Sequence, residues 1–447
     1  MPRSPERVAV LGGGVTGITT GLLLQLGGRP TIIYTQSRPR RSGPSHFASL
    51  HAAASVLPHS VRSSRMSAWL RQSQAIYRLL AFRANAGVRK QTHYELFERP
   101  TSDLPAYAAA VDDIEAIDAG SIGPGTPYRT GAAFVSGWRF DVYFCEAPTY
   151  LSYLYRFFEA IGGVVVDVGD DSGIDGELAG YVRLGHRVVV NCTGHGVTSL
   201  LDERRVAALD DRPDGDRFSP LLDPWGFRVV RGHYLRVAVR QQLVDERGRF
   251  LSYNYTPTAD VYATADGVPA DVYCYPRSDC WILGGSRQPR VVDEEGERWL
   301  GDDAVAALEA RGSDGRVMTV PQPILTLNAD LIEGLTNGEL SLLGMRDTPG
   351  LLTGGIGYRF ERTHPDESIR VDASRVALDG NEAVVLHNYG HGGAGFTLSW
   401  GCALDVVGVL DALDAGGWSV PSCRPRHENA EFSADASQLT DVVGRLR

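Results

Sequence analysis

The chain has 447 residues and a formal net charge of −10, and 43% of its residues are hydrophobic. This length exceeds one ordinary core and predicts two closely built domains, while the acidic balance argues against a nucleic-acid partner. No signal peptide and no run of 18 apolar residues is present, so we expect a cytoplasmic protein with no membrane contact. The six cysteines have no C-x-x-C spacing, which favours neither a disulfide framework nor a zinc site.

The first elements along the chain predict a βαβ unit. The apolar run Val8–Leu11 is typical of a buried parallel strand, and a helix from Ile18 to Leu26 and a strand over Pro30–Tyr34 follow it. Between strand and helix stands Gly12-x-Gly14-x-x-Gly17, a turn that lets a pyrophosphate approach the backbone at a helix N-terminus. The turn therefore predicts dinucleotide binding but does not distinguish FAD from NAD.

The next elements alternate between helices, strands and irregular chain. Residues 37–60 are rich in Ser, Arg and Pro and then in small apolar residues, which indicates an irregular segment lying against a ligand. Further patterns predict helices over Met66–Phe82 and Tyr150–Gly162, and strands over Val164–Val168 and Val188–Val190.

The second half of the chain changes character. Residues 225–345 alternate as strands do, and after Gly357 short elements lead to a helix over Gly395–Leu413 and a loose polar tail. We therefore predict an α/β protein, in which a discontinuous Rossmann-type cofactor domain carries an inserted β-rich (α+β) substrate-binding domain. The expected boundaries are 1–58, 146–205 and 350–425 for the first domain, 59–145 and 206–349 for the second, and 426–447 for the tail.

The most distinctive segment is His387-Asn388-Tyr389-Gly390-His391-Gly392-Gly393-Ala394-Gly395-Phe396-Thr397, followed by Leu398-Ser399-Trp400-Gly401. Its glycines expose backbone dipoles that can surround a planar ring, and a helix begins directly after them. His387 and His391 would share a face only on a helix, and the glycine content argues against one, so no metal site is predicted here.

This segment resembles the C-terminal signature of the D-amino-acid oxidase and D-aspartate oxidase family, which are FAD enzymes. Other landmarks follow in the family's order. They are the turn at 12–17, Ala52-Ala53-Ala54 with Pro58, Asn191-Cys192-Thr193-Gly194, Arg231-Gly232-His233, Tyr273-Cys274-Tyr275-Pro276, Leu283-Gly284-Gly285, and Gly357-Tyr358-Arg359-Phe360-Glu361-Arg362. The resemblance covers residues 7–410, weakly in 60–145 and 205–265.

The resemblance implies a substrate site. Arg362 matches the arginine that holds the substrate α-carboxylate, a role that suits the planar fork of a guanidinium, although a surface ion pair with an acidic neighbour stays open and Arg359 is a nearby competitor. Tyr273 matches a tyrosine that helps to bind the same carboxylate, with a core aromatic as the alternative. Gly393 matches the position whose carbonyl accepts from the substrate amine.

The resemblance also implies the FAD contacts. A family acidic residue is missing at the end of the second strand, where Gln36 stands, and this leaves the ribose contact there in question. The expected cofactor-binding residues are Gly12, Gly14, Val15, Thr16, Gly17, Gln36, Ser49, Ala53, Thr193, Gly392, Gly393, Gly395, Phe396 and Thr397.

Two further matches point to an acidic substrate side chain. His59 after Pro58, and Arg287 within Gly284-Gly285-Ser286-Arg287-Gln288, resemble carboxylate-binding residues of the D-aspartate oxidase branch. A cation in the pocket would favour an acidic side chain and disfavour an apolar one. The alternative is that both residues are structural. Pro269 replaces a lid tyrosine of the D-amino-acid oxidases, and 250–270 contains an insertion.

The implied activity is oxidation of a D-amino acid, with acidic side chains favoured. A hydride passes to flavin N5, and the products are a 2-oxo acid, ammonia and hydrogen peroxide. The expected partners are an amino acid and molecular oxygen, and a homodimer stays open. The alternatives are a flavin oxidase of glycine, an N-methyl or a biosynthetic amino acid, a dehydrogenase with another electron acceptor, and a flavin-binding protein without turnover.

Overall fold

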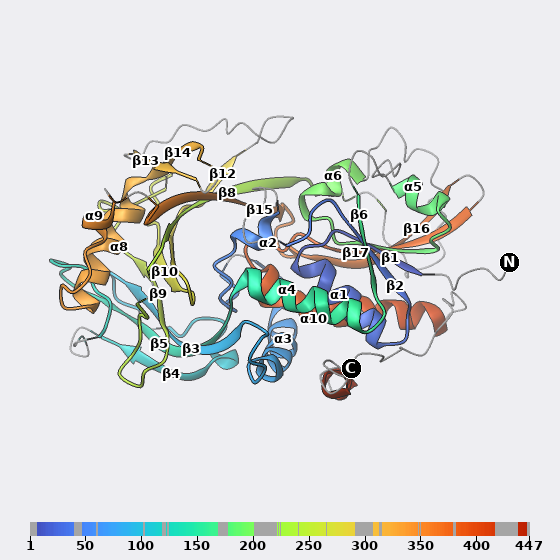
Figure 1. The fold of residues 1–447 in the computed structure, drawn as a ribbon, viewed down its shortest axis with the longest axis horizontal. Coiled ribbons are helices and arrows are strands. Elements are labelled where there is room, and N and C mark those ends of the chain that lie inside the picture. Colours follow the sequence, from blue (N-terminus) through green and yellow to red (C-terminus); the bar gives the residue numbers. More distant parts are fainter. Residues whose placement is uncertain are drawn as a thin grey trace.

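The structure is a computed structural model. It describes residues 7–39, 47–59, 61–101, 103–118, 122, 125–168, 178–200, 221, 223, 225–239, 241–264, 266–290, 307–312, 315–346, 348, 350–378, 381–415 and 437–444. The molecule is elongated, with two halves side by side along its long axis (Figure 1). Each half is built around its own large sheet.

The first half contains a six-stranded sheet in the order β16-β17-β7-β1-β2-β6. The strands from β17 to β6 are parallel, and β16 is an antiparallel edge strand. Parallel strands buried on both faces require continuous apolar runs, such as those in β1 and β7. The bounds are β1 (Val8–Leu11), β2 (Thr31–Thr35), β6 (Val164–Asp167), β7 (Val188–Asn191), β16 (Arg370–Leu378) and β17 (Asn381–Tyr389).

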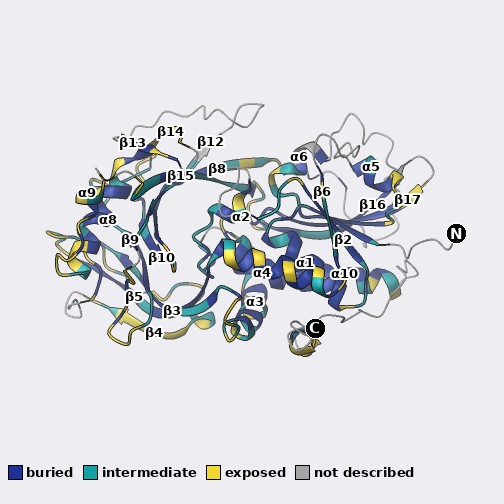
Figure 2. Ribbon diagram, viewed as in Figure 1, coloured by how far each residue is buried: buried dark blue, intermediate teal, exposed yellow. Residues whose placement is uncertain are grey.

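Helices cover both faces of this sheet, because successive side chains of a strand point to opposite sides. Val8 and Val10 of β1 join one core, with α1, α3, α4 and α10, whereas Ala9 and Leu11 join another, with α5 and α6. The buried strands between the helices are visible in Figure 2. The bounds are α1 (Val15–Leu26), α2 (Ala48–His51), α3 (Met66–Leu80), α4 (Ala147–Ala160), α5 (Leu178–Arg183), α6 (Val197–Leu200) and α10 (Gly395–Ala415).

Helix α10 is the central helix of the first core. By length and composition it is the one helix among the described residues that could cross a membrane, but 72% of its apolar window is buried inside the protein. Trp400, Leu404 and Val407 are among its buried side chains. Its burial identifies it as the core helix of this half.

The second half contains a nine-stranded, mostly antiparallel sheet. Its order is β12-β8-β11-β10-β9-β3-β5-β4, and β15 pairs with β8 as well. The strand bounds are β3 (Val88–Phe97), β4 (Asp112–Ile117), β5 (Ser136–Cys145), β8 (Phe227–Val237), β9 (Leu251–Thr256), β10 (Val272–Pro276), β11 (Trp281–Gly284), β12 (Gln288–Arg290) and β15 (Leu352–Arg362).

A helix and a small hairpin close the second half. Helix α8 packs one face of the sheet with Ile324, Leu325, Leu331 and Ile332, all of which are buried. This helix lies inside residues 225–345, which alternation predicted to be strands. The helix was missed because its amphipathic pattern is short and directly follows a strand. The remaining elements are β13 (Ala307–Arg311), β14 (Val317–Pro321), α8 (Gln322–Leu335), α9 (Leu342–Met345) and the 3-10 turns at 108–110 and 194–196.

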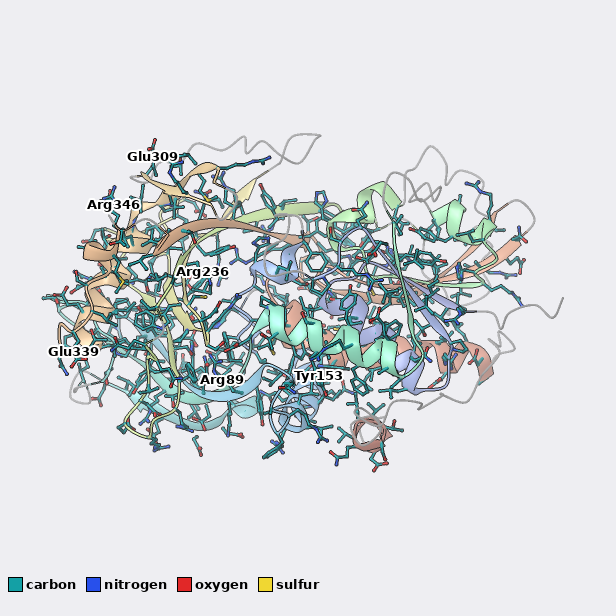
Figure 3. The ribbon with its side chains drawn as sticks, in the orientation of Figure 1. Arg89, Tyr153, Arg236, Glu309, Glu339 and Arg346 are labelled. Atoms are coloured by element: carbon teal, nitrogen blue, oxygen red, sulfur yellow. The ribbon has the colours of Figure 1, made fainter. Side chains whose placement is uncertain are left out.

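Arg89 lies at the junction of the two halves, near the start of β3, and is labelled in Figure 3. Its guanidinium carbon lies 4.4 Å from the centroid of the Phe144 ring and 3.9 Å from that of Phe250. It donates to Glu146 Oε1 at 2.6 Å, just before α4, and to the carbonyl of Pro276 at the end of β10. One side chain therefore links β3, β5, β10 and the start of α4.

Two expectations about boundaries differ from the structure. Strand β15 lies after the predicted domain boundary at 350, yet it pairs along its whole length with β8 of the second sheet. The predicted loose tail includes a helix at 437–444, whose Leu439 is 1% exposed and packs against the first core. Residues 206–220, 291–306 and 416–436 lie outside the described residues.

Candidate active site

The glycine turn joins β1 to α1 in the geometry that a dinucleotide requires. Gly12 has a φ of +100°, and a Cβ added there would lie 2.4 Å from the carbonyl oxygen of Cys192. A Cβ at Gly17 would lie 1.8 Å from the carbonyl oxygen of Gly12. Only glycine fits these two positions. Gly14 is the N-cap of α1, so Val15, Thr16 and Gly17 form the first helical turn.

The segment after β2 lies directly over this turn. Ser49 Oγ accepts from the backbone N–H of Val15 at 3.0 Å. The following residues are held by backbone hydrogen bonds, from Cys145 N–H to the carbonyl of Ala54 and from Val56 N–H to that of Tyr143. This anchoring explains how a chain without regular structure keeps Ala53 at a fixed position.

One cavity runs from the glycine turn into the second half. It encloses about 1010 Å³ of empty space, part of it continuous with solvent. Its wall contains residues from the turn, from the 48–59 segment, from four strands of the second sheet, and from the C-terminal glycine loop. Among the sequence-predicted site residues, the cavity is lined by Val15, Ser49, Ala53, His59, Tyr273, Arg287, Gly392, Gly393, Gly395 and Phe396.

The arginine of β15 that lines this cavity is Arg359. It lies close to Gly232 on the paired strand β8, where an added Cβ would be 2.4 Å from Arg359 Nη1. Its Nη1 donates to the carbonyl of Ser286 at 3.4 Å. Burial and the nearby Arg287 lower the pKa of Arg359 from its ordinary value, against the opposing effects of Tyr273, Asp271 and Glu361. A guanidinium has no accessible neutral form, so Arg359 is a half-buried cation facing the cavity.

The prediction that Arg362 is the substrate clamp is wrong in this structure. Arg362 is not among the residues that line the cavity. Its Nε donates to Asp223, its Nη2 donates to Asp223 Oδ1 at 3.0 Å, and its Nη1 donates to the carbonyl of Glu367 at 2.8 Å. The two side chains are 10% and 1% exposed. The physical reason is a complete ion pair: Arg362 already has the buried carboxylate of Asp223, whereas no carboxylate of the described residues forms an ion pair with Arg359.

Tyrosines and an asparagine form a second wall near Arg359. Tyr273 lies beside Arg359, and burial raises the pKa of its hydroxyl while Arg359 lowers it. The neighbouring Tyr275 is 3% exposed and donates to Asn254 Oδ1 at 2.5 Å. Asn254 Nδ2 donates to Asp271 Oδ2 at 3.0 Å. The phenol of Tyr273 can therefore act together with the Arg359 guanidinium on one anion.

His59 and Arg287 are brought together at the same end of the cavity. Arg287 Nε lies 3.8 Å from Asp271 Oδ1, and 40% of the arginine side chain is exposed. His59 Nδ1 lies 3.6 Å from Glu95 Oε1. Burial, and after it the charge of Arg287, lower the pKa of His59 to about 4. Burial, and after it the charge of Asp271, raise the pKa of Glu95 to about 8.

Seven predicted cofactor residues lie outside the cavity wall: Gly12, Gly14, Thr16, Gly17, Gln36, Thr193 and Thr397. Thr397 is 1% exposed, and its hydroxyl donates to the carbonyl of Leu57 at 3.1 Å, so its side chain secures the 55–57 segment. Thr193 donates its hydroxyl to Asn191 Oδ1 at 2.8 Å. Gln36 follows β2 and is exposed. The Thr397 hydroxyl is already used inside the protein, and a contact between Thr397 and the cofactor stays a prediction.

Several cavity residues were not predicted from the sequence. His51 Nδ1 and the hydroxyl of Tyr234 are 2.9 Å apart, and both line the cavity. Glu95 and Asp271 lie behind His59 and Arg287. For Arg359, a signal was present in the glycine of Arg231-Gly232-His233. A glycine has no side chain and therefore leaves room for a large side chain on the neighbouring strand.

The chemistry of the site fits a dinucleotide and an anion but gives no indication of a metal. Within the described ranges, no three His, Cys, Asp or Glu side chains gather as a metal site. His387 and His391 are both buried, and burial lowers their pKa values. The glycine loop around Gly393 and the turn at 12–17 are the parts of the wall that could surround an FAD ring and its pyrophosphate.

Comparison with known proteins shows the family of the chain. The family described as "DAO: FAD dependent oxidoreductase" matches residues 7–407. The chain is 26% identical over 412 residues to a D-amino-acid oxidase of Rubrobacter xylanophilus, covering 92% of this chain and 97% of that protein. It is 22% identical over 412 residues to the D-aspartate oxidase of Homo sapiens, covering 90% and 94%.

Solved structures share the fold. Glycine oxidase from Geobacillus kaustophilus gives a TM-score of 0.54 at 16% identity, covering 93% of this chain and 98% of that chain. The FAD-bound L-alpha-glycerophosphate oxidase of Mycoplasma pneumoniae gives 0.54 at 12% identity, covering 94% and 97%. The family match spans most of the chain, and its curated relatives oxidise amino acids by name. The chain belongs to the DAO family and is an FAD-dependent amino-acid oxidoreductase.

Proposed function

We propose that the protein deaminates D-amino acids with an acidic side chain, producing the 2-oxo acid, ammonia and hydrogen peroxide. One observation carries the proposal: two guanidinium groups, Arg359 and Arg287, line the same cavity that reaches the glycine turn. Two fixed cations in one buried space repel each other, and a substrate with two carboxylates relieves both. The D configuration is supported by the names of the curated relatives.

The α-carboxylate is assigned to Arg359 and Tyr273. A guanidinium can donate two parallel hydrogen bonds to a carboxylate, and such charge-assisted bonds are short and strong. Tyr273 supplies a hydroxyl beside Arg359, where burial disfavours its ionisation. Together the two side chains fix the position of the α-carbon, which is the main requirement for a hydride to leave it.

The amine is assigned to the carbonyl oxygen of Gly393. This residue lies in the cavity wall and is exposed there. When bound, FAD would supply the two-electron acceptor for the hydride of the α-carbon. The protein's part is to orient a neutral amine and to exclude water from the C–H bond. No general acid–base pair is needed for that step.

The side-chain carboxylate is assigned to Arg287 and His59. Arg287 lies 3.8 Å from Asp271, beyond hydrogen-bonding distance, so its donors are not used by that carboxylate. The nearby negative charge weakens the field of Arg287 without removing it. This partial neutralisation favours a second candidate, oxidation of a D-amino acid with a neutral polar side chain such as an amide.

Anaerobic reduction of the bound flavin distinguishes the candidates. The purified yellow protein would be mixed under argon with D- and L-aspartate, D-asparagine, D-alanine and glycine, and loss of flavin absorbance followed. We expect D-aspartate to reduce it fastest. Faster reduction by D-asparagine would favour the second candidate, and preference for D-alanine or glycine would contradict the acidic proposal. Hydrogen peroxide formed in air, one per imine, separates an oxidase from a dehydrogenase.

A further inference from the structure

A histidine and a glutamate, each partly buried, form a pair at the wall of the cavity. His59 lines the cavity, and Glu95 of β3 lies behind it, with 3.6 Å between Nδ1 and Oε1. The side chains are 20% and 13% exposed. Neither His59 Nε2 nor Glu95 Oε2 has a hydrogen-bond partner among the described residues. Each unpaired buried polar atom costs roughly 1–3 kcal/mol, which indicates that a ligand or water completes the pair.

The charges around the pair nearly balance. Arg287 and Asp271 act on both members in opposite directions, and burial dominates both pKa values. The titratable and charged groups near the pair are Arg287, Asp271, His93, Tyr107 and Tyr275. His93 is itself fully buried, and its pKa lies well below the ordinary value. Burial therefore favours a neutral imidazole beside a protonated carboxyl group in the free enzyme.

We propose that Glu95 sets side-chain specificity by giving its proton to His59 when an anionic side chain binds. The Glu95 O–H bond breaks, an N–H bond forms at His59 Nδ1, and no proton is exchanged with solvent. The imidazolium then faces the ligand carboxylate, and the new Glu95 carboxylate lies behind it. With a neutral side chain the proton stays on Glu95. This inference rests on the proposed function, because it requires a substrate with a second carboxylate.

The arrangement avoids a problem that a permanent cation would create. Arg359 and Arg287 already face the cavity, and a third fixed positive charge would destabilise the empty site by repulsion. A proton that moves only when the anion arrives supplies the charge without that cost. The 3.6 Å separation needs to shorten by about half an ångström to reach hydrogen-bonding distance, which a small side-chain rotation provides. Glu95 is thus a positioning residue that acts through His59.

Calorimetry can detect this internal proton transfer. The FAD-loaded protein would be titrated with succinate, a dicarboxylate without an amine, and with butyrate, in phosphate and in Tris at pH 7. The difference in heat between buffers gives the number of protons taken up. For the unchanged protein we expect succinate to bind with no net uptake. For Glu95→Gln we expect uptake of close to one proton and at least tenfold weaker succinate binding.

The matched control is Glu115→Gln, on the exposed strand β4, where the glutamate side chain is 57% exposed. It should behave as the unchanged protein. If Glu95→Gln binds succinate equally tightly and without proton uptake, the proton transfer is overturned while the proposed function stands. If the unchanged protein binds no succinate and is not reduced by D-aspartate, the proposed function fails and this inference fails with it.

A measurement on the unchanged protein covers the case in which Glu95→Gln does not fold. Below pH 8, the approximate pKa of Glu95, the proton is already in the pair, so succinate affinity should stay constant from pH 6 to 8. Above that pH the proton must come from solvent, so affinity should fall up to tenfold per pH unit. Butyrate affinity should not show this fall. Parallel pH profiles for the two ligands would overturn the inference.

Discussion

The two halves of the molecule hold their ligands by different means. In the cofactor half the groups that matter are backbone atoms, exposed where glycines replace side chains at 12–17 and 390–395. In the substrate half they are side chains from several strands, Arg359 on β15, Tyr273 on β10 and Glu95 on β3. Backbone sites depend on contiguous sequence, whereas side-chain sites depend on which face of each strand is turned inward. The first kind of site tolerates little change, and the second can be retuned one residue at a time.

The largest effect is expected from the backbone site. In Gly17→Ala the added methyl would lie 1.8 Å from the Gly12 carbonyl oxygen, so strand and helix must separate. We expect purified Gly17→Ala protein to carry less than a tenth of the FAD of the unchanged protein, measured as the ratio of flavin to protein absorbance. Gly408→Ala is the control, because nothing lies within 4 Å of a Cβ there. Full FAD content in Gly17→Ala would show that the turn is not needed.

The next prediction compares Arg359 and Arg362, which both lie on β15. Arg359→Ala should lower kcat/KM about a thousandfold, because two charge-assisted hydrogen bonds of about 2 kcal/mol each are lost. Arg359→Lys should recover only part of it, since an ammonium cannot form the planar fork. Steady-state kinetics with D-aspartate provide the measurement.

Arg362→Ala is the matched variant and should lower stability rather than activity. It leaves Asp223 buried without its partner, which costs about 3–5 kcal/mol of unfolding free energy, while kcat/KM changes little in the folded protein. Urea denaturation gives the free energy. A kinetic loss in Arg362→Ala at unchanged stability would return the clamp to Arg362.

The smallest effect concerns the side-chain end of the cavity. Arg287→Leu should lower the preference for D-aspartate over D-asparagine by roughly 10–100-fold, mainly through KM, because one cation is removed and an apolar group replaces it. The control is Arg236→Leu on β8, labelled in Figure 3, whose side chain is also 40% exposed but pairs with Asp279 outside the cavity wall. Equal selectivity in both variants would exclude Arg287 from side-chain recognition.

The sequence predicts the features whose signals are local and misses those that depend on distant residues. The βαβ start, α3, α4 and α10 were predicted within a few residues, because apolar periodicity and glycine turns are local signals. The choice between Arg359 and Arg362 was not local. The two residues have opposite parity on β15, so their side chains point to opposite faces of the sheet, and of the two only Arg359 lines the cavity. Which arginine faces the cavity depends on Gly232 of β8, which leaves room for Arg359, and on Asp223, which pairs with Arg362. Both residues are far away in sequence.

The helix at 437–444 and Glu95 were missed for a similar reason. The C-terminal helix is too short and polar to be recognised alone, and contacts of Leu439, Val442 and Val443 with the first core give it support. Glu95 is one acidic residue in a strand that alternation did not identify, and its partner His59 precedes it in a different segment. Their relation depends on packing between segments, which no spacing records.

The first sheet combines strands from early and late parts of the described chain, and this has a consequence for how the protein folds during synthesis. Strand β7 gains its neighbour β17 only when residues 381–389 have been made, and Asn388 then donates to Thr20 of α1 at 3.1 Å. On the ribosome the glycine turn at 12–17 therefore emerges long before the strand β17 and the helix α10 that enclose it. Such distant pairings fold slowly. Acquisition of flavin colour should thus follow the synthesis of residues 381–415, and a chain truncated before 381 should emerge colourless.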